Sequence, residues 1–317
     1  MADITAARIN NLQSSIALIL GSGSGQTGYG QTVTSSPVNN TGDVVEAADM
    51  NAIYTDILAA RVHQVGPGDA GIAEVIAGPA LDFVGDTRGN IVAEDTSNYI
   101  DNQGVTSIDP DGFKKGVVDF ETLMTQVQAD KSIMHPSQAA LEPGISSARS
   151  SNWNGLITHE VAVTFSSAEE KRFFFNTGGE IRISANNTSA TTAKGLDWSA
   201  LSSQVGTIKF SAEVTVSSSG GGSSIGNYDL TSAFQNIYQK IGSGTNQGVY
   251  AGNMYTVKAR SDIDTRIIFR IEFNDVAAVG NVDNNVDGRL ESTIQHLRAN
   301  GDVTVVAPTY FNTITLA

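Results

Sequence analysis

Residues 207–216 read TIKFSAEVTV, and apolar side chains occupy every second position of this segment. Lys209, Ser211 and Glu213 alternate with them. A period of two is typical of a β-strand with one buried face, because successive side chains of a strand point to opposite sides. We therefore expect a single strand whose buried face carries Ile208, Phe210, Ala212, Val214 and Val216.

The same alternation recurs on both sides of this segment, from His159 onward. HEVAVTF (159–165) alternates, and KRFFFNTGGEIRISA (171–185) predicts a strand, a tight Asn-Thr-Gly-Gly turn and a returning strand. Further strands are predicted at 255–259, 266–273, 288–297, 302–307 and 309–316. A glycine-rich loop at 217–226 leads to a pattern of helical period, which predicts one helix at 229–241 with Leu230, Phe234, Ile237 and Ile241 inward.

The N-terminal residues follow the helical period instead. Ile9, Leu12, Ile16 and Ile19 share one face of a first helix, and Met50, Ile53, Ile57 and Ala60 share one face of a second, from about Val45 to His63. A lone helix cannot bury its apolar face, so the two helices must pair or pack against another subunit. The residues expected to dock a partner are Ile9, Leu12, Ile16, Ile19, Met50, Ile53 and Ile57.

These patterns divide the chain into four regions. Residues 1–65 form a helical docking region, and 66–135 form a mixed, irregular module with a helix near 119–134. Residues 136–158, rich in Ser, Pro and Gly, are expected to be a linker. Residues 159–317 are expected to form an antiparallel β-sandwich, jelly-roll-like, with one inserted helix. The fold class predicted is therefore α+β.

A glycine-rich segment, LGSGSGQTGYGQ (20–31), contains a Gly-x-Gly-x-x-Gly match at 23–28. A dinucleotide-binding loop needs these glycines between a strand and a helix, so that the helix N-terminus meets the phosphates. Here the glycines follow a helix, and Pro37 prevents a helix from starting soon after them. The segment is therefore interpreted as a joint, and no nucleotide cofactor is expected.

Composition excludes several classes of protein. Cysteine is absent from the 317 residues, which excludes disulfides and zinc–thiolate sites. The net charge is −14, of which −11 falls in residues 1–158, so nucleic acid is not an expected partner. No apolar run approaches the roughly 18 residues of a membrane span, and no export signal is visible, so we expect a protein that folds where it is made.

No group of residues predicts catalysis. His63 and His135 are placed at helix ends, where a cation favours the helix dipole, and His296 is in phase with Leu290 and Ile294 as a core or interface residue. Asp283–Gly288 matches the first half of a calcium loop, but Ile294 stands where the glutamate ligand belongs. This segment is interpreted as a turn. Neither an enzyme, a cofactor nor a metal is expected.

Several segments together resemble one group of proteins. GSGSGQTGYGQTVTSS between two helices, the second ending ARVHQVG, is similar to the N-terminal part of virion structural proteins of marine tailed phages, notably those of cyanobacteria. RFFFNTGGEIRISA, LDWSAL, YDLTSAFQNIY and VDGRLESTIQHLRANGDVTVVAP resemble the β-domain of the same group. The resemblance covers the two helices and nearly all of 159–317, whereas 66–158 matches poorly.

The resemblance implies a non-enzymatic virion structural protein of the tail, neck or fibre apparatus, made in the host cytoplasm. Its implied partners are other virion proteins and further copies of itself, and no catalytic residue is carried over. The alternative is a receptor- or glycan-binding adhesin that recognises a host surface, for which Trp153 and Trp198 are the candidate aromatics. A polysaccharide hydrolase would need two carboxylates about 5–10 Å apart in a cleft.

Overall fold

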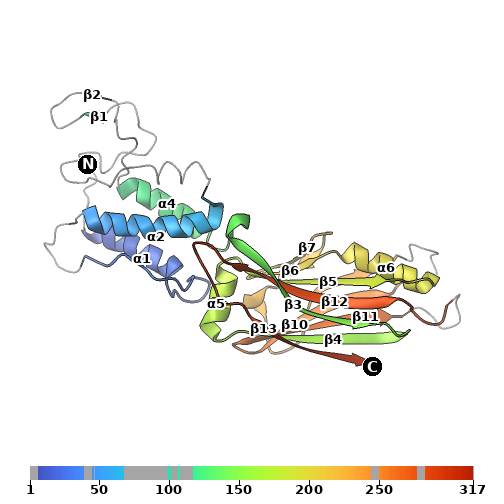
Figure 1. The fold of residues 1–317 in the computed structure, drawn as a ribbon. Helices are drawn as coiled ribbons and strands as arrows, with labels where there is room; N and C mark the ends of the chain where they lie inside the picture. The colour runs from blue at the N-terminus through green and yellow to red at the C-terminus, as the bar shows by residue number, and fades with distance from the viewer. Residues whose placement is uncertain are drawn as a thin grey trace. The chain divides into compact units, whose positions relative to one another are not determined.

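The computed structural model describes residues 6–38, 45, 47–67, 99–100, 106–107, 117–243, 250–276 and 283–316 (Figure 1). The chain divides into two compact units. The helical unit comprises Met1–Ala139, Arg172–Gly178 and Ala299–Val305, and the sandwich unit comprises Ala140–Lys171, Gly179–Arg298 and Val306–Ala317. Helices come first and two antiparallel sheets follow, so the predicted α+β class and the C-terminal sandwich are confirmed.

The helical unit is built on three helices that pack against one another: α1 (Ala6–Leu20), α2 (Ala47–Val65) and α4 (Val117–Ala129). Two predicted helices are therefore present, and the third begins and ends a few residues earlier than 119–134. Each helix buries one apolar stripe, as its spacing predicts. The buried residues are Ile9, Leu12, Ile16, Ile19, Leu20, Met50, Ile53, Ile57, Ala60, Phe120, Met124 and Val127.

The glycine-rich segment after α1 is an ordered connection held by Tyr29. Its ring is buried against His63 in an edge-to-face contact of 5.2 Å, and its hydroxyl donates to the Lys131 carbonyl at 2.7 Å. The amides of Tyr29 and Gly30 donate to the carbonyls of Ile19 and Gly21. These amides are satisfied by the chain itself, as expected of a joint. Gly30 has a φ of 72° and lies against the Phe173 ring, so a side chain there would collide.

Two later segments of the chain complete the helical unit. The Thr177 carbonyl lies 3.0 Å from Nε2 of His63, and Nδ2 of Asn176 donates to the Gly28 carbonyl at 3.2 Å. In the segment 299–305, the Thr304 carbonyl accepts from Gln31 at 3.0 Å. The unit is therefore assembled from residues that are far apart in the sequence.

The sandwich unit contains two antiparallel sheets. The β4 sheet has the order β13-β4-β11-β10-β9, and the β12 sheet has the order β3-β12-β5-β6-β7-β8. Phe210 of the β12 sheet meets Phe269 of the β4 sheet edge-to-face at 5.2 Å, so the two sheets pack face to face. The β4 sheet comprises β4 (Gly155–Thr164), β9 (Gln235–Ile241), β10 (Met254–Ile263), β11 (Arg266–Asp275) and β13 (Thr309–Leu316).

The β12 sheet comprises β3 (Ala139–Arg149), β5 (Glu180–Thr188), β6 (Ile208–Phe210), β7 (Thr215–Ser217), β8 (Gly222–Ser223) and β12 (Arg289–Ala299). Two helices, α5 (Ala168–Asn176) and α6 (Ala193–Val205), lie between strands in sequence. A separate pair of short strands, β1 (Tyr99–Ile100) and β2 (Thr106–Ser107), belongs to neither sheet.

The segment 207–216 is not a single strand but a hairpin of β6 and β7. Ser211 turns the chain, because its amide and its hydroxyl both donate to the Val214 carbonyl, at 3.0 and 2.8 Å. Phe210 consequently pairs with Thr215, and Val214 and Val216 are exposed rather than buried. The alternation of apolar and polar residues continues through the turn, so the turn could not be predicted from the period alone.

Two predictions of secondary structure are reversed. Residues 171–175, expected as a strand, lie in α5, whose start is capped by Ser167 accepting from the Glu170 amide at 3.1 Å. Residues 229–241, expected as the inserted helix, contain strand β9, whose backbone pairs with β10. Only Ile237 of its four predicted inward residues is buried, because sheet pairing overrides the helical spacing. The helices that are inserted between strands are α5 and α6.

Two further expectations were wrong. The expected linker 136–158 contains β3 and the start of β4, because Pro143 and Gly144 are tolerated in a strand at a sheet edge. The expected strand 302–307 forms no strand; Thr304 makes only an isolated bridge to Asn300. The predicted strands at 255–259, 266–273, 288–297 and 309–316 correspond to β10, β11, β12 and β13.

Asp56 of α2 fixes the connection between α1 and α2. Its carboxylate accepts hydrogen bonds from the amide and hydroxyl of Thr34, at 2.9 and 2.7 Å, and from those of Ser35, at 2.9 and 2.6 Å. The Asp56 side chain is buried, with the residue 1% exposed. A carboxylate with four such donors is strongly bound, because charge-assisted hydrogen bonds are the strong ones.

Replacing this carboxylate by an amide tests the contribution of Asp56. We expect Asp56→Asn to lower the free energy of unfolding by about 2–4 kcal/mol. The amide nitrogen would face two hydrogen-bond donors, and it cannot accept a hydrogen bond from either of them. Urea unfolding followed by circular dichroism measures the loss. Glu169→Gln, at an exposed position in the first turn of α5, is the control, with an expected loss of at most about 1 kcal/mol. Equal losses in both variants would contradict the assignment.

Candidate assembly surface

The two sheets of the sandwich end in four edge strands, and three of them carry features that discourage pairing. Strand β8 has only two residues. Strand β3 contains Pro143 between its ends and a charge at Glu142, and β9 carries Lys240 and pairs with β10 through an irregular register. Short edges, prolines, charges and irregularities are the usual means by which proteins block the addition of a foreign strand.

Strand β13 lacks these features. Its eight residues read TYFNTITL, with no charge, proline or glycine, and all eight pair in an unbroken antiparallel register with β4. Figure 1 shows β13 as the outermost strand beside β4, and in the described part of the chain no strand follows it. No described strand pairs with the outer backbone groups of β13, so among these residues that edge is free for a partner strand.

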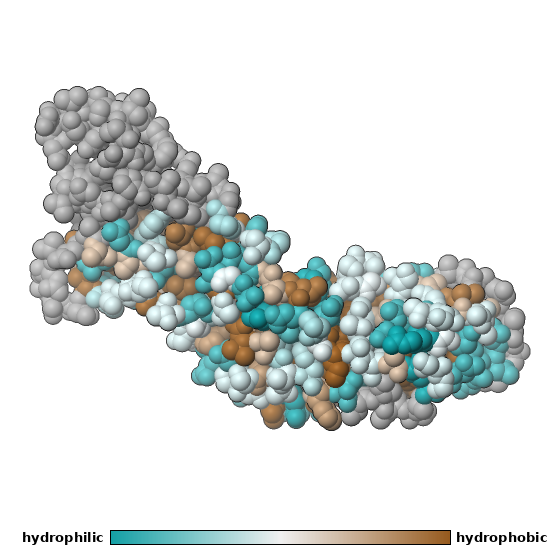
Figure 2. All heavy atoms as spheres, in the orientation of Figure 1, coloured by the Kyte–Doolittle hydropathy of each residue, from teal (hydrophilic) through white to brown (hydrophobic). Residues whose placement is uncertain are grey.

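Among the sandwich residues whose burial the structure describes, Phe311 is the most exposed large apolar residue, with 71% of its surface exposed. It pairs with Ala162 of β4, which alternates with buried Val161 and Val163, so Phe311 stands on the outer face of the β4 sheet. Figure 2 shows brown apolar patches among white and teal residues over the sandwich face in view. The other exposed large apolar residues in the described part of the sandwich unit are Leu141, Leu196, Val214, Val216, Ile241, Ile263, Val276 and Val306.

Tyr310 anchors β13 to the opposite sheet. Its hydroxyl lies 2.8 Å from Nδ1 of His296, and Nε2 of His296 lies 3.1 Å from the Glu142 carboxylate. The other oxygen of Glu142 accepts from Arg298 at 2.6 Å. A Cβ on Gly144 would come within 2.8 Å of the Tyr310 ring, so the absence of a side chain there leaves room for it. Tyr310 thus connects the face of β13 that points into the sandwich to the opposite sheet.

Burial of this network favours a neutral imidazole at His296. Burial lowers the pKa of His296 against the opposing effect of the Glu142 carboxylate. The hydrogen bond from Arg298 lowers the pKa of Glu142, and burial raises the pKa of Tyr310. The core position predicted for His296 is confirmed, since the residue is 2% exposed. Its partners on β3 and β13 could not be predicted, because they lie far away in the sequence.

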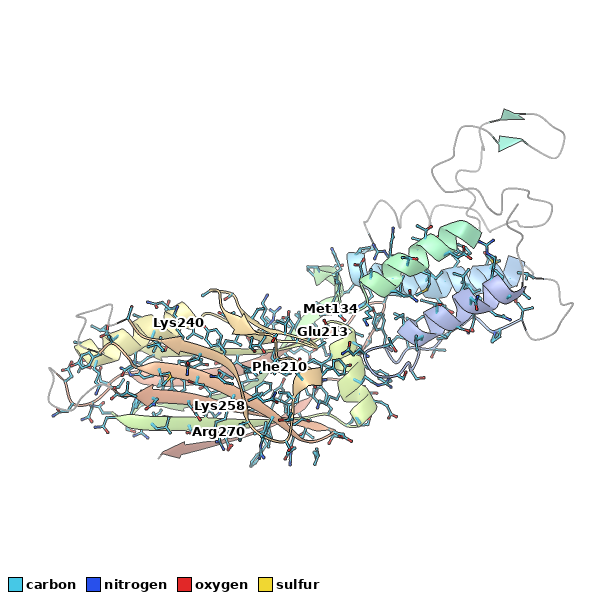
Figure 3. All side chains as sticks on the ribbon, turned by 180° about the vertical axis from the view of Figure 1, so that it is seen from behind. Met134, Phe210, Glu213, Lys240, Lys258 and Arg270 are labelled. Carbon is cyan, nitrogen blue, oxygen red and sulfur yellow. The ribbon has the colours of Figure 1, made fainter. Side chains whose placement is uncertain are left out.

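The outer face of the β4 sheet beside β13 carries charges that are paired across strands. Lys258 and Arg270 lie opposite each other on β10 and β11 (Figure 3). Lys258 contacts Glu272 at 2.9 Å, and Arg270 contacts Glu160 at 3.0 Å while its guanidinium carbon lies 4.0 Å from the Phe234 ring centroid. These cross-strand pairs leave little net charge next to the uncharged edge.

The seven residues expected to dock a partner do not form an open surface. Ile9, Ile16, Met50 and Ile53 are 0% exposed, and Leu12, Ile19 and Ile57 are at most 4% exposed. The prediction was wrong for these side chains, because α4 covers the face that the first two helices leave open. Sequence reasoning missed Phe311 and the open edge, although the uncharged composition of 309–316 was a readable signal.

The other histidines serve the fold. His63 lies in the last turn of α2, as predicted, but burial lowers its pKa to about 4, so it does not act there as a cation. His135 precedes a short 3₁₀ turn and accepts from the Ser137 amide at 3.2 Å, rather than ending the third helix. His159 is 1% exposed on the inner face of β4, and neither ring nitrogen has a partner among the described residues.

The calcium-like segment 283–288 anchors the start of α6. The Asp287 carboxylate accepts from the amide and hydroxyl of Thr191, at 2.8 and 2.7 Å, and also from those of Thr192. Burial alone would raise the pKa of Asp287, but these hydrogen bonds lower it to about 2. The described residues hold no group of three or more potential metal-binding side chains, and Ile294 lies within β12. The arrangement agrees with a turn.

The candidate sugar-binding aromatics are core residues. Trp153 is 4% exposed and Trp198, on α6, is 0% exposed; their rings lie 5.2 Å apart. Trp198 also packs on Phe273 at 5.9 Å. Stacking on a sugar needs an accessible ring, so neither tryptophan supports the adhesin alternative.

Two lysines of the sandwich unit, Lys171 and Lys194, are buried. Nζ of Lys171 donates to the Ser261 hydroxyl at 3.0 Å, and burial lowers the pKa of Lys171 to about 8. The Ser261 hydroxyl in turn lies 3.1 Å from the Arg266 carbonyl, so its proton is directed to the backbone and the pair braces the β10–β11 hairpin. Lys194 and Asp275 form an ion pair at 2.6 Å with both side chains 1% exposed.

Comparison with protein-family models, with curated proteins and with solved structures finds no match to this chain. Among the helices that the structure describes, none combines the length and apolar composition that crossing a bilayer requires.

The ion pair between Lys194 and Asp275 predicts a large effect of a single substitution. We expect Lys194→Met to cost about 3–5 kcal/mol of unfolding free energy, because it leaves the Asp275 carboxylate buried without its ammonium partner. Lys258→Met, which removes a partly exposed pair with Glu272, should cost at most about 1 kcal/mol. Urea unfolding measures both losses. Similar values for the two variants would contradict the burial of the Lys194 pair.

Protonation of His159 predicts acid sensitivity of the sandwich unit. Burial lowers the pKa of His159 to about 4, below about 6.5 in the unfolded chain. The unfolded state therefore takes up the proton first, and stability is complete above about pH 6.5 and falls by up to about 3 kcal/mol towards pH 4. His159→Leu should flatten this acid limb.

Both tryptophans lie in the sandwich unit, so their fluorescence during urea unfolding at several pH values reports on that unit. His135→Gln is the control and should keep the wild-type slope. An unchanged acid limb in His159→Leu would show that His159 is not the group responsible.

Proposed function

We propose that this chain is a non-enzymatic structural protein of a phage virion, in the tail, neck or fibre apparatus, made in the host cytoplasm. It joins other virion proteins through the open edge β13. The observation that carries the proposal is a self-contained sandwich with one long, uncharged edge strand and an exposed Phe311 on it. An edge of this kind invites pairing with another chain, and monomeric proteins usually block it.

The use of polar residues supports a structural role. Asp56 and Asp287 hold hydroxyls and amides of their own chain, and Glu142 holds Arg298 and His296. Lys194 and Asp275 neutralise each other inside the fold. In each of these clusters the charged groups stabilise the backbone or each other, and none of them pairs a nucleophile with a poised base.

The likeness of the quoted segments to virion proteins of marine tailed phages supports the particle location. Attachment through the apolar faces of α1 and α2 is not retained, because those faces are buried. The proposed attachment site is instead on the sandwich, where β13 offers backbone hydrogen bonds and Phe311 offers apolar surface.

Purified virions of the phage that encodes the chain provide the test. Mass spectrometry should recover its peptides at a fixed ratio to the other virion proteins, and a cryo-EM map should contain density for the sandwich at symmetric positions. Recovery of the chain from infected-cell lysate but never from purified particles would overturn the proposal.

A further inference from the structure

We infer that the partner of β13 is β13 of a second copy, paired antiparallel about a two-fold axis so that the two β4 sheets join into one. This inference rests on the proposed function, which makes the β13 edge an assembly site. It adds which strand binds there. It follows from the chemistry of the strand, from the geometry of antiparallel pairing and from the distribution of charge.

The strand offers no means of selecting a foreign sequence. Its residues carry no charge, and the described pockets, one beside Tyr250 and one beside Glu121, do not include β13. The attraction comes from backbone groups and from apolar surface, which any complementary strand satisfies. A strand with the same length and composition is always present at the same concentration in the form of another copy.

Symmetry permits this pairing in a restricted set of registers. Directly opposed residues of an antiparallel pair lie on the same face of the sheet. A two-fold axis perpendicular to the sheet must therefore pass through a pair of identical residues, because an axis between residues would oppose positions from different faces. The centre of the eight-residue strand places this axis at Asn312 or Thr313. Phe311 then lies within one or two residues of the axis.

Electrostatics also permits two copies to approach at this edge, although the chain carries a net charge of −14. The acidic residue in register with Thr313 is Glu160 of β4, which is paired with Arg270. Across β13 and its copy, the two Glu160 positions lie three strand spacings apart, about 14 Å. This distance exceeds the Debye length of about 8 Å at physiological ionic strength, so repulsion between them is weak.

The pairing is tested by placing a charge on the edge of the full-length protein. Sedimentation velocity over a concentration series should show a monomer–dimer equilibrium for the wild type. Phe311→Lys should raise the dissociation constant at least about tenfold, because it brings like charges together near the axis and removes apolar contact. Phe311 is 71% exposed, so the substitution is not expected to disturb the fold.

Ile241→Lys provides the matched control. Ile241 is 57% exposed and ends β9, at the opposite edge of the same sheet. Its dissociation constant should stay within about twofold of the wild type, since surface substitutions away from an interface have small effects. Equal weakening by both variants would overturn the inference, as would a wild type that stays monomeric at about 100 μM, where even weak specific pairs associate.

The absence of cysteine makes the register directly measurable. Asn312→Cys or Thr313→Cys should form a disulfide with its own copy under mild oxidation, because directly opposed residues bring their Cβ atoms to about 5 Å. Ser146→Cys, exposed on the β3 edge, should stay unlinked. Crosslinking at Ser146 alone, or a trimer in place of a dimer, would overturn pairing through β13.

The experiments separate this inference from the proposed function. A protein that is monomeric in solution but present in purified virions refutes the self-pairing and leaves the structural role, with β13 bound by another virion protein. A protein that dimerises through β13 but is missing from virions supports the self-pairing and refutes the proposed function.

Discussion

An antiparallel sandwich has two sheets and therefore four edges, and each edge presents backbone amides and carbonyls that another strand can bind. In this molecule three of the four edges meet this constraint, each in a different way. Strand β8 has only two residues, β3 contains Pro143, and β9 carries Lys240 and pairs with β10 in an irregular register. Strand β13 has none of these features, and its Tyr310 contacts His296 of the opposite sheet. An uncharged strand without proline or glycine, tied to the opposite sheet through Tyr310, distinguishes this edge from the other three.

The sequence was sufficient for the fold class because its two periods are long and clean. The stripes of α1 and α2 and the alternation of β10, β11 and β12 each span enough residues to exclude the other period. Prediction failed where a local hydrogen bond decides the structure. The Ser211 turn lies inside an alternating run, and the Ser167 cap begins a helix in a segment rich in phenylalanine. The serine followed three residues later by Glu170 was a readable helix start that alternation outweighed.

The candidate surface was harder to predict, because an edge is a property of topology. The order of strands decides whether TYFNTITL is central or peripheral, and no local pattern gives that order. The same reason explains the error over the N-terminal helices. Their apolar faces were read correctly, but the partner that covers them is α4, more than fifty residues further along the chain. A third helix of the same chain and a foreign subunit produce the same amphipathic pattern.

The composition of the helical unit has a consequence for synthesis on the ribosome. His63 needs the Thr177 carbonyl, and Gln31 needs the Thr304 carbonyl, so the unit that contains the first helix also contains residues near the other end of the chain. Domains usually fold in order as they emerge. Here the first helices leave the ribosome early but remain incomplete until about residue 305 follows. A truncated chain ending before that point would leave Gln31 without the Thr304 carbonyl, and the helical unit could not be isolated as one contiguous fragment.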